Sequence, residues 1–275
     1  MPELNEATRR NIQSALARLD IGSGPIVVTA ASHGHIDLLR NWLCHMTAVG
    51  LSSRVLVLAM DEEVASGIGD EAVAARAAFD GSIDDLWRQR ALVWRLLSDS
   101  RVEFIHSDTD ALWLRDPLGF CSEIDADLVF SQGTDFPLST LSVWEFVLCC
   151  GFFVARSSAA TAALFGELAR TSDGAFDDQI ALNELLVRAE TRWDKGSTSS
   201  FYLSYAGSKF RCFAEPILGS CEVMDLKLAL LPHQSFVRLP PGGAHPFIKH
   251  LLLKYETLDD RCAALRAHGC WKLDT

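Results

Sequence analysis

The sequence lacks several features that would assign it to a class at once. No run approaches the ~20 consecutive apolar residues of a membrane-spanning helix, and residues 1–6 lack the basic-then-apolar order of a secretory signal. None of the eight cysteines forms a Cys-x-x-Cys pair, which disfavours a structural zinc site and agrees with free thiols. We therefore expect no membrane span and a cytoplasmic location.

Positive charge is also scarce. The chain has 36 acidic and 25 basic residues, which gives a formal net charge of −11. A field of this sign repels phosphate backbones and anionic lipid, so we expect no nucleic-acid partner and no role at a membrane surface. A small phosphorylated ligand is still compatible with this charge, because a metal ion or a few local cations can hold it.

What is present is the composition of a globular protein. Of the 275 residues, 49% are hydrophobic and 22% are charged, enough for a substantial core. No internal repeat, low-complexity segment or clear linker divides the chain. The sequence predicts a single domain over 1–275, with an N-terminal helix within 1–24, a half at 25–155 and a second half at 156–275.

Apolar, β-branched runs alternate with helical patterns along the first half. The expected strands are 25–31, 54–59, 102–106, 127–130 and 149–155, and the expected helices include 84–97 and the segment after the loop 32–35. This alternation predicts an α/β sheet flanked by helices, with ligands bound beyond the carboxyl ends of the strands. We expect one rim to carry Ala31–His35, Asp61, Asp108, Asp110 and the segment after Ala155. After about residue 200 the pattern loosens into an irregular C-terminal part, closed by a helix at 258–268.

The most informative segment is the acidic turn after the third expected strand. Asp108 and Asp110 stand two positions apart directly after a buried run, where like charges raise each other's pKa unless a cation neutralises them. Carboxylate oxygens suit Mg²⁺ or Mn²⁺, and such a metal could clamp a diphosphate. The alternative is that the two acids only cap the turn into the next element.

The segment Ser107-Asp-Thr-Asp-Ala-Leu-Trp-Leu-Arg-Asp-Pro-Leu118 resembles the signature of the nucleotide-diphospho-sugar transferases, of the plant arabinosyl- and xylosyltransferase type (family 77). Further pieces follow in the family's order: Asn41-Trp-Leu43, Val57-Leu-Ala-Met-Asp61, Cys150-Gly-Phe-Phe-Val154, Asp178-Gln-Ile-Ala-Leu-Asn183 and Leu265-Arg-Ala-His-Gly-Cys-Trp271. The resemblance covers about residues 25–271. It implies a retaining glycosyltransferase of GT-A type, with a Rossmann-like mixed sheet flanked by helices.

The resemblance also implies a metal site and a donor. Asp110 is the expected direct ligand of Mn²⁺ (or Mg²⁺), while Asp108 contacts the metal or the donor ribose, with Thr109 between them. A C-terminal histidine completes the ligand set. His250, followed by Lys254, fits the spacing to the final tryptophan, whereas His245, followed by Lys249, has the better turn context. The spacing favours His250, and His245 stays the alternative.

Other positions are expected to contact the substrates. Asp178 faces the sugar and Gln179 binds sugar or acceptor hydroxyls, although Asp178 or Asp177 could instead be the N-cap of a helix. Arg90 matches a basic residue that reaches the donor phosphates, with an exposed helix position as the alternative. Small residues let a base approach the backbone, so the nucleotide is expected at Thr29, Ala30 and Ala31.

The resulting hypothesis is a metal-dependent glycosyltransferase. It would move a sugar from a nucleotide-diphosphate sugar, by resemblance a UDP-sugar, to a hydroxyl of a glycan, protein or small metabolite, with retention. One alternative is a haloacid-dehalogenase-type phosphatase, but that class opens its domain with Asp-x-Asp and needs a later acidic loop that is missing here. The other alternative is a non-catalytic binding module on a GT-A-like scaffold.

Overall fold

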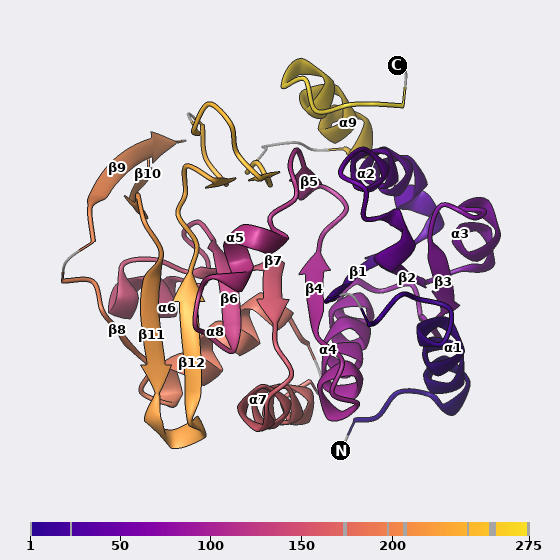
Figure 1. Ribbon diagram of the computed structural model, residues 1–275, viewed down its shortest axis with the longest axis horizontal. Helices are drawn as coiled ribbons and strands as arrows, with labels where there is room; N and C mark the ends of the chain where they lie inside the picture. The colour runs from indigo at the N-terminus through magenta and orange to yellow at the C-terminus, as the bar shows by residue number, and fades with distance from the viewer. Residues whose placement is uncertain are drawn as a thin grey trace.

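The computed structural model describes residues 2–22, 24–172, 175–196, 198–205, 208–240, 242–252 and 257–273. Its centre is a nine-stranded mixed sheet of these residues (Figure 1). In spatial order the strands are β3 (Val73–Arg76), β2 (Val55–Ala59), β1 (Ile26–Ala31), β4 (Phe104–Ser107), β7 (Leu148–Ala155), β6 (Leu128–Gln132), β12 (Leu226–Leu230), β11 (Ile217–Cys221) and β8 (Arg192–Trp193).

The remaining strands form a hairpin and a small second sheet. A hairpin joins β9 (Ser200–Tyr205) to β10 (Ser208–Phe213), and a small three-stranded sheet has the order β13 (Phe236–Val237), β14 (Ile248–Lys249) and β5 (Leu112–Trp113). The helices are α1 (Glu6–Leu16), α2 (Ile36–Ala48), α3 (Glu62–Gly67), α4 (Ile83–Asp99), α5 (Leu118–Ser122), α6 (Leu138–Trp144), α7 (Ala159–Arg170), α8 (Asp178–Arg188) and α9 (Leu258–Ala267). Among the described residues, none of these helices is both long and apolar enough to cross a lipid bilayer.

Two apolar layers pack against the two faces of the sheet. Successive strand residues point to opposite faces, so Phe104 belongs to the apolar layer that includes residues of α1, α4, α7 and α8, while Ile105 belongs to the layer that includes residues of α2, α3, α5 and α9. Every residue of β2 and β4 and nearly every residue of β1 is buried, because both faces of these strands are covered, and β1 and β2 are apolar except for Thr29. The expected α/β class, with a mixed sheet flanked by helices, is confirmed.

Most elements expected in the first half are found. Helix α4 begins where the side chain of Ser82 accepts a hydrogen bond from the backbone N–H of Asp85, which satisfies one of the free N–H groups at its start. Strands β3, β9, β10, β11 and β12 were not expected. The irregular part expected after about residue 200 is wrong for 200–230, which contain β9 to β12, and only beyond β12 do the described residues before α9 form no more than the short strands β13 and β14.

One expectation about the ligand-binding rim is wrong. Strand β7 pairs antiparallel with both β4 and β6, so the segment after Ala155 lies at the end of the sheet opposite to Asp108. The beginning of β7, around Cys149–Gly151, lies at the rim instead. A fully buried strand has the same apolar composition whichever way it runs, so its direction could not be obtained from its pattern.

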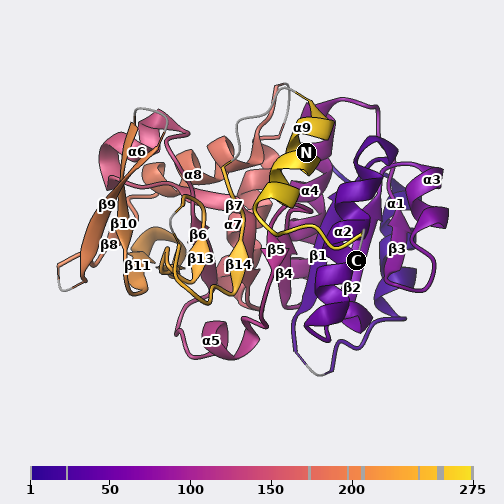
Figure 2. The same cartoon turned by 90° about the horizontal axis from the view of Figure 1, so that it is seen from above.

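The C-terminal segment packs against the first half of the chain. After α9 it crosses α2 (Figure 2), where the side-chain amide of Asn41 donates to the carbonyl of Cys270 at 3.1 Å. The carbonyl of Asn41's side chain accepts from the backbone N–H of Lys272 at 2.6 Å. Two segments of the family resemblance, Asn41–Leu43 and Leu265–Trp271, therefore meet in space, and they hold the C-terminal residues close to the ends of β1 and β4.

Candidate active site

The acidic turn follows β4 directly and is held by main-chain contacts. The backbone N–H of Asp108 donates to the carbonyl of Gly151 at 2.8 Å, and the N–H of Ala111 donates to the carbonyl of Asp108 at 3.0 Å. Asp110 is buried, while Asp108 and Thr109 are partly exposed. The turn thus directs two carboxylates into the edge of the sheet at a point that solvent still reaches.

His250 reaches this turn through the small sheet. Strand β14 pairs antiparallel with β5, with Lys249 opposite Leu112, so the residue that follows β14 lies beside the residues that precede β5. The Nε2 atom of His250 is 3.3 Å from Oδ1 of Asp110 and 3.8 Å from Oδ2 of Asp108.

One ligand atom from each of Asp108, Asp110 and His250 lies within 4.8 Å of the other two. Two carboxylates and an imidazole form a donor set suited to Mn²⁺ or Mg²⁺, so the residues present fit a divalent cation. His245 is outside this group, and its carbonyl accepts from the guanidinium of Arg115 at 3.0 Å.

Arg90 joins two acids of the site. Its side chain is only 8% exposed, with Nη1 3.1 Å from Oδ1 of Asp108 and Nε 3.0 Å from Oδ2 of Asp178. The second contact is an ion pair without hydrogen-bond geometry, since neither of its two atoms has a hydrogen bond within the described structure. The exposed position considered as the alternative for Arg90 is therefore wrong.

Burial and the neighbouring charges shift the pKa values of Asp108 and Asp178 in opposite directions. Burial alone would raise the pKa of the Asp108 carboxyl, but Arg90 and two histidines outweigh burial and hold that pKa well below its usual range. For Asp178 burial is the larger effect, and it raises the pKa to about 7 in spite of Arg90. The site therefore combines a carboxylate that stays ionised with a carboxyl that titrates near neutral pH.

Helix α8 begins at the second pair of acids. Asp177 is the N-cap, because its side chain accepts from the backbone N–H of Ile180 at 2.9 Å, and Asp178 points inward to Arg90. The amide of Gln179 binds main chain at both ends: its oxygen accepts from the N–H of Cys150 at 3.2 Å, and its nitrogen donates to the carbonyl of Phe136 at 2.7 Å. Gln179 thus ties α8 to the start of β7 and to the loop before α6.

The residues expected to receive the nucleotide lie on the same rim. Strand β1 is parallel to β4, with Val28 opposite His106, so Thr29, Ala30 and Ala31 continue β1 toward the same end of the sheet at which the acidic turn follows β4. Thr29 is fully buried, and its hydroxyl has no hydrogen-bond partner in the described structure. Asp61 holds the neighbouring loop by accepting from the backbone N–H of His33, and it caps α3 as well.

Several residues of the site were not expected. His106 accepts from the indole N–H of Trp94 through Nδ1 at 3.2 Å, so its Nε2 carries the proton and donates to Asp108 at 3.3 Å. Arg261, from α9, forms an ion pair with Oδ2 of Asp110. His106 could have been suspected from its place just before the acidic turn, but no local pattern in the sequence pointed to Arg261.

Cys149 and Gly151 line the site from β7. Burial alone would raise the pKa of the Cys149 thiol, but Arg238 and His250 lower it to about 6. A Cβ atom on Gly151 would lie 2.5 Å from Oδ2 of Asp108, so only glycine leaves room for the turn.

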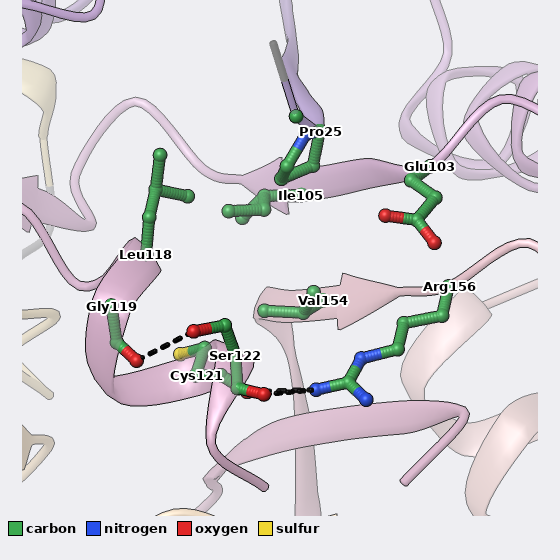
Figure 3. A pocket seen from close by; sticks show the side chains of 10 residues that line it. Pro25, Glu103, Ile105, Leu118, Gly119, Cys121, Ser122, Val154 and Arg156 are labelled. Carbon is green, nitrogen blue, oxygen red and sulfur yellow. Dashed lines mark hydrogen bonds between the residues drawn. The ribbon is translucent and has the colours of Figure 1, made fainter. Parts of the chain in front are cut away.

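A separate cavity lies at the other end of the sheet. It has a volume of about 300 Å³, and its walls include Pro25, Glu103, Ile105, Leu118, Val154 and Arg156 (Figure 3). Pro25 and Glu103 precede the strands whose far ends carry the candidate site. The guanidinium of Arg156 already donates to the carbonyls of Cys121, Ser122 and Ile124. This cavity is therefore distinct from the group around Asp108.

A mixed sheet with an acidic turn after a central strand, and with a metal-type donor set beyond it, is the arrangement expected of enzymes that act on nucleotide sugars. The family model of the nucleotide-diphospho-sugar transferases matches residues 50–274. The chain therefore belongs to the nucleotide-diphospho-sugar transferase family, as its sequence motifs suggested.

Individual proteins are similar to parts of this chain. An arabinosyltransferase of Arabidopsis thaliana, XEG113, is 24% identical over 203 residues, which cover 66% of this chain and 31% of the relative. The chain thus spans less than a third of that relative's length. Among solved structures, the galactosyltransferase LgtC with donor and acceptor sugar analogues has a TM-score of 0.41 and 13% identity over 58% of this chain and 69% of LgtC. Mouse xyloside xylosyltransferase 1 has a TM-score of 0.40 and 9% identity over 60% of this chain and 82% of the mouse protein.

Proposed function

We propose that this chain is a metal-dependent glycosyltransferase that moves a sugar from a nucleotide-diphosphate sugar to a hydroxyl acceptor, with retention. The observation that carries the proposal is the donor set of Asp108, Asp110 and His250 within 4.8 Å at the end of β4. Mn²⁺ or Mg²⁺ held by these residues would neutralise the charge that develops on the departing nucleoside diphosphate.

The charges of the chain agree with an anionic donor. Asp108, Asp110 and Asp178 face the two arginines Arg90 and Arg261, and a divalent cation would turn this excess of negative charge into an excess of positive charge. Such a field attracts a nucleoside diphosphate. We place the donor along β1 and β4, with Thr29, Ala30 and Ala31 beside the nucleotide and Thr109 beside the diphosphate.

Asp178 is the group that we assign to the reacting sugar. It is 2% exposed, and its Oδ2 has no hydrogen bond within the described structure, so it can still accept one from a substrate hydroxyl. Arg90 fixes the position of Asp178 relative to Asp108. In this role Asp178 orients the acceptor or stabilises positive charge at the anomeric carbon, while Gln179, whose amide also binds the main chain of Cys150 and Phe136, hydrogen-bonds the sugar or acceptor hydroxyls.

The donor nucleotide, the sugar and the acceptor are proposed from the family to which the chain belongs. A UDP-linked donor carrying a pentose or hexose is proposed from the family resemblance of the sequence, and the acceptor is a glycan, a protein or a small metabolite. In this proposal residues 25–155 form the nucleotide-sugar-binding half and residues 156–275 form the acceptor-side half, which also supplies His250 to the metal site. The cytoplasmic location expected from the sequence remains a prediction.

The experiment that tests the function combines binding with catalysis. The melting temperature is measured with Mn²⁺ alone, with UDP-sugars alone and with both, because a ligand of the native state raises it. We expect a rise with UDP-sugar that depends on Mn²⁺, together with slow metal-dependent hydrolysis of the donor that the D110A variant lacks. Binding without hydrolysis or transfer would favour a non-catalytic module, and the absence of any shift would refute the proposal.

A further inference from the structure

His250 packs directly on the backbone of β7. A Cβ atom at Gly151 would lie 2.1 Å from Cε1 of His250 and 2.8 Å from its Nδ1, so the imidazole occupies the space that any other residue would fill. The sulfur of Cys149, two residues earlier, lies 3.7 Å from the same Nδ1 atom. The pairing between β6 and β7 shifts register in this region, and such bulges re-aim side chains next to functional sites.

The two ring nitrogens of His250 face different chemical groups. Nε2 faces the carboxylates of Asp108 and Asp110, whereas Nδ1 faces the buried thiol of Cys149. A histidine that ligates a metal through one nitrogen needs a hydrogen on the other, and that hydrogen needs an acceptor. In the described structure the sulfur of Cys149 is the polar atom that faces Nδ1, and it can accept this hydrogen when Nε2 binds a metal.

Cys149 lies beside the donor set without joining it. Its sulfur is not among the ligand atoms that lie within 4.8 Å of one another, which come from Asp108, Asp110 and His250. The main chain of His250 is held separately, because the guanidinium of Arg238 donates to its carbonyl at 2.8 Å. The neighbouring Cys150 points away, with its thiol 3.8 Å from the carbonyl of Asp178.

We propose that Cys149 is a positioning residue that stabilises the metal-binding tautomer of His250, in which Nδ1 carries the hydrogen and the lone pair of Nε2 is available to a divalent cation at the acidic turn. The proposal rests on the metal-dependent function proposed above. It assigns a thiol to a place where a carboxylate or a main-chain carbonyl is usual. Loss of the thiol would then let His250 exchange tautomers and turn away from the acids.

The first measurement uses Mg²⁺ at the concentration that saturates the wild type, because without a cation the carboxylates that face Nε2 would favour a hydrogen on that atom. Histidine labelled with ¹⁵N gives long-range proton–nitrogen spectra that distinguish the two neutral tautomers at pH 8, and the H250Q variant identifies the signals of His250. We expect the wild type to show hydrogen on Nδ1 only, and C149A to show a mixture. In C149S the hydroxyl oxygen accepts the same hydrogen bond, so the wild-type tautomer should return.

The second measurement is Mn²⁺ affinity from the electron paramagnetic resonance of the free ion. C149A should weaken binding by about 10- to 100-fold, as loss of an outer partner of a metal ligand does. C149S should stay within about threefold of the wild type, because its hydrogen bond is kept. The matched control is C121A, which removes a buried thiol at the opposite end of the sheet and should leave the affinity unchanged.

The outcomes separate this proposal from the function on which it rests. An unchanged tautomer in C149A, or wild-type Mn²⁺ affinity in that variant, would overturn the role of Cys149 and leave the glycosyltransferase proposal intact. Failure of C149S to restore the tautomer would also overturn it. If the wild type itself binds neither Mn²⁺ nor Mg²⁺, the metal-dependent function is wrong and the role of Cys149 fails with it, whereas the outcomes for C149A and C149S refute the role of Cys149 alone.

Discussion

The Nε atom of Arg90 lies 3.0 Å from Oδ2 of Asp178, and the same guanidinium reaches Asp108 through Nη1. Arg90 and Asp178 are 7% and 2% exposed. The buried guanidinium of Arg90 therefore lies between two acids to which we assign different roles. Asp108 contacts the metal, and Asp178 faces the sugar. Removal of the guanidinium should affect both the stability and the geometry of the site.

The variant R90M tests this arrangement. Breaking a buried ion pair by removing one partner typically costs ~3–5 kcal/mol, because the remaining charge is left uncompensated. We expect a loss of this size in the free energy of unfolding, measured by urea denaturation. Addition of D178N should recover part of the loss, since it removes the orphaned acid. The exposed pair of Arg10 and Glu6 supplies the control R10M, which should change stability little. A similarly small effect of R90M would contradict the model of a buried charge cluster.

The variant D110N tests the metal site. The amide keeps the shape of Asp110 but loses the charge that a hard divalent cation requires. Because loss of an outer partner already costs about 10- to 100-fold in metal affinity, loss of a direct ligand should cost at least about 100-fold. Isothermal titration with Mn²⁺ gives the affinity, and D70N, at an exposed acid remote in sequence from the turn, is the matched control. Equal affinities of the wild type and D110N would remove Asp110 from the ligand set.

The variant G151A tests the close approach of His250 to β7. The added methyl group would lie 2.1 Å from Cε1 of His250 and 2.5 Å from Oδ2 of Asp108, so one of them has to move. Overpacking of this kind costs about 1–3 kcal/mol, and Mn²⁺ binding should weaken as well. The control is G166A within α7, where a Cβ atom has no neighbour within 4 Å and where alanine should stabilise the helix by about 1 kcal/mol. Normal metal affinity in G151A would show that the site tolerates a shift of this strand.

The pH dependence of stability should report the buried His233. Burial lowers the pKa of His233 from 6.5 to about 4. Below pH 6.5 the unfolded chain takes up a proton that the folded chain refuses until about pH 4, so stability falls as the pH falls. This residue contributes ~3 kcal/mol of the loss across that interval. Urea denaturation from pH 7 to pH 4.5 should give a shallower decline for H233Q than for the wild type, and H268Q, at an exposed histidine, should follow the wild type. Parallel curves for the wild type and H233Q would contradict the burial of a neutral imidazole.

Local patterns predicted much of the first half of the fold. Strands β1 and β2 are runs of apolar, often β-branched residues apart from Thr29, β4 begins with two apolar residues, and α4 shows helical spacing after a Ser N-cap. The hairpin of β9 and β10 could not be predicted in the same way, because polar residues interrupt its apolar positions and its pairing depends on register between strands.

The same distinction applies to the residues of the candidate site: some could be recognised from the local sequence, and others only from the tertiary structure. Asp108 and Asp110 could be recognised from their place after a buried strand, because that signal lies within a few neighbouring residues. The choice between His245 and His250 as partner depends on the pairing of β14 with β5. The capping role of Asp177, and with it the inward direction of Asp178, depends on where α8 begins.

The sequence by itself determined the family, the succession of buried strands and the acidic turn, since each is written in residues that are close together along the chain. Only the tertiary structure decided the direction of β7, the ion pairs of Arg90 and Arg261, and the contact between Cys149 and His250. The physical reason is that these contacts join segments distant in the chain, and their partners are selected by packing and charge in the folded state rather than by any local preference of the backbone.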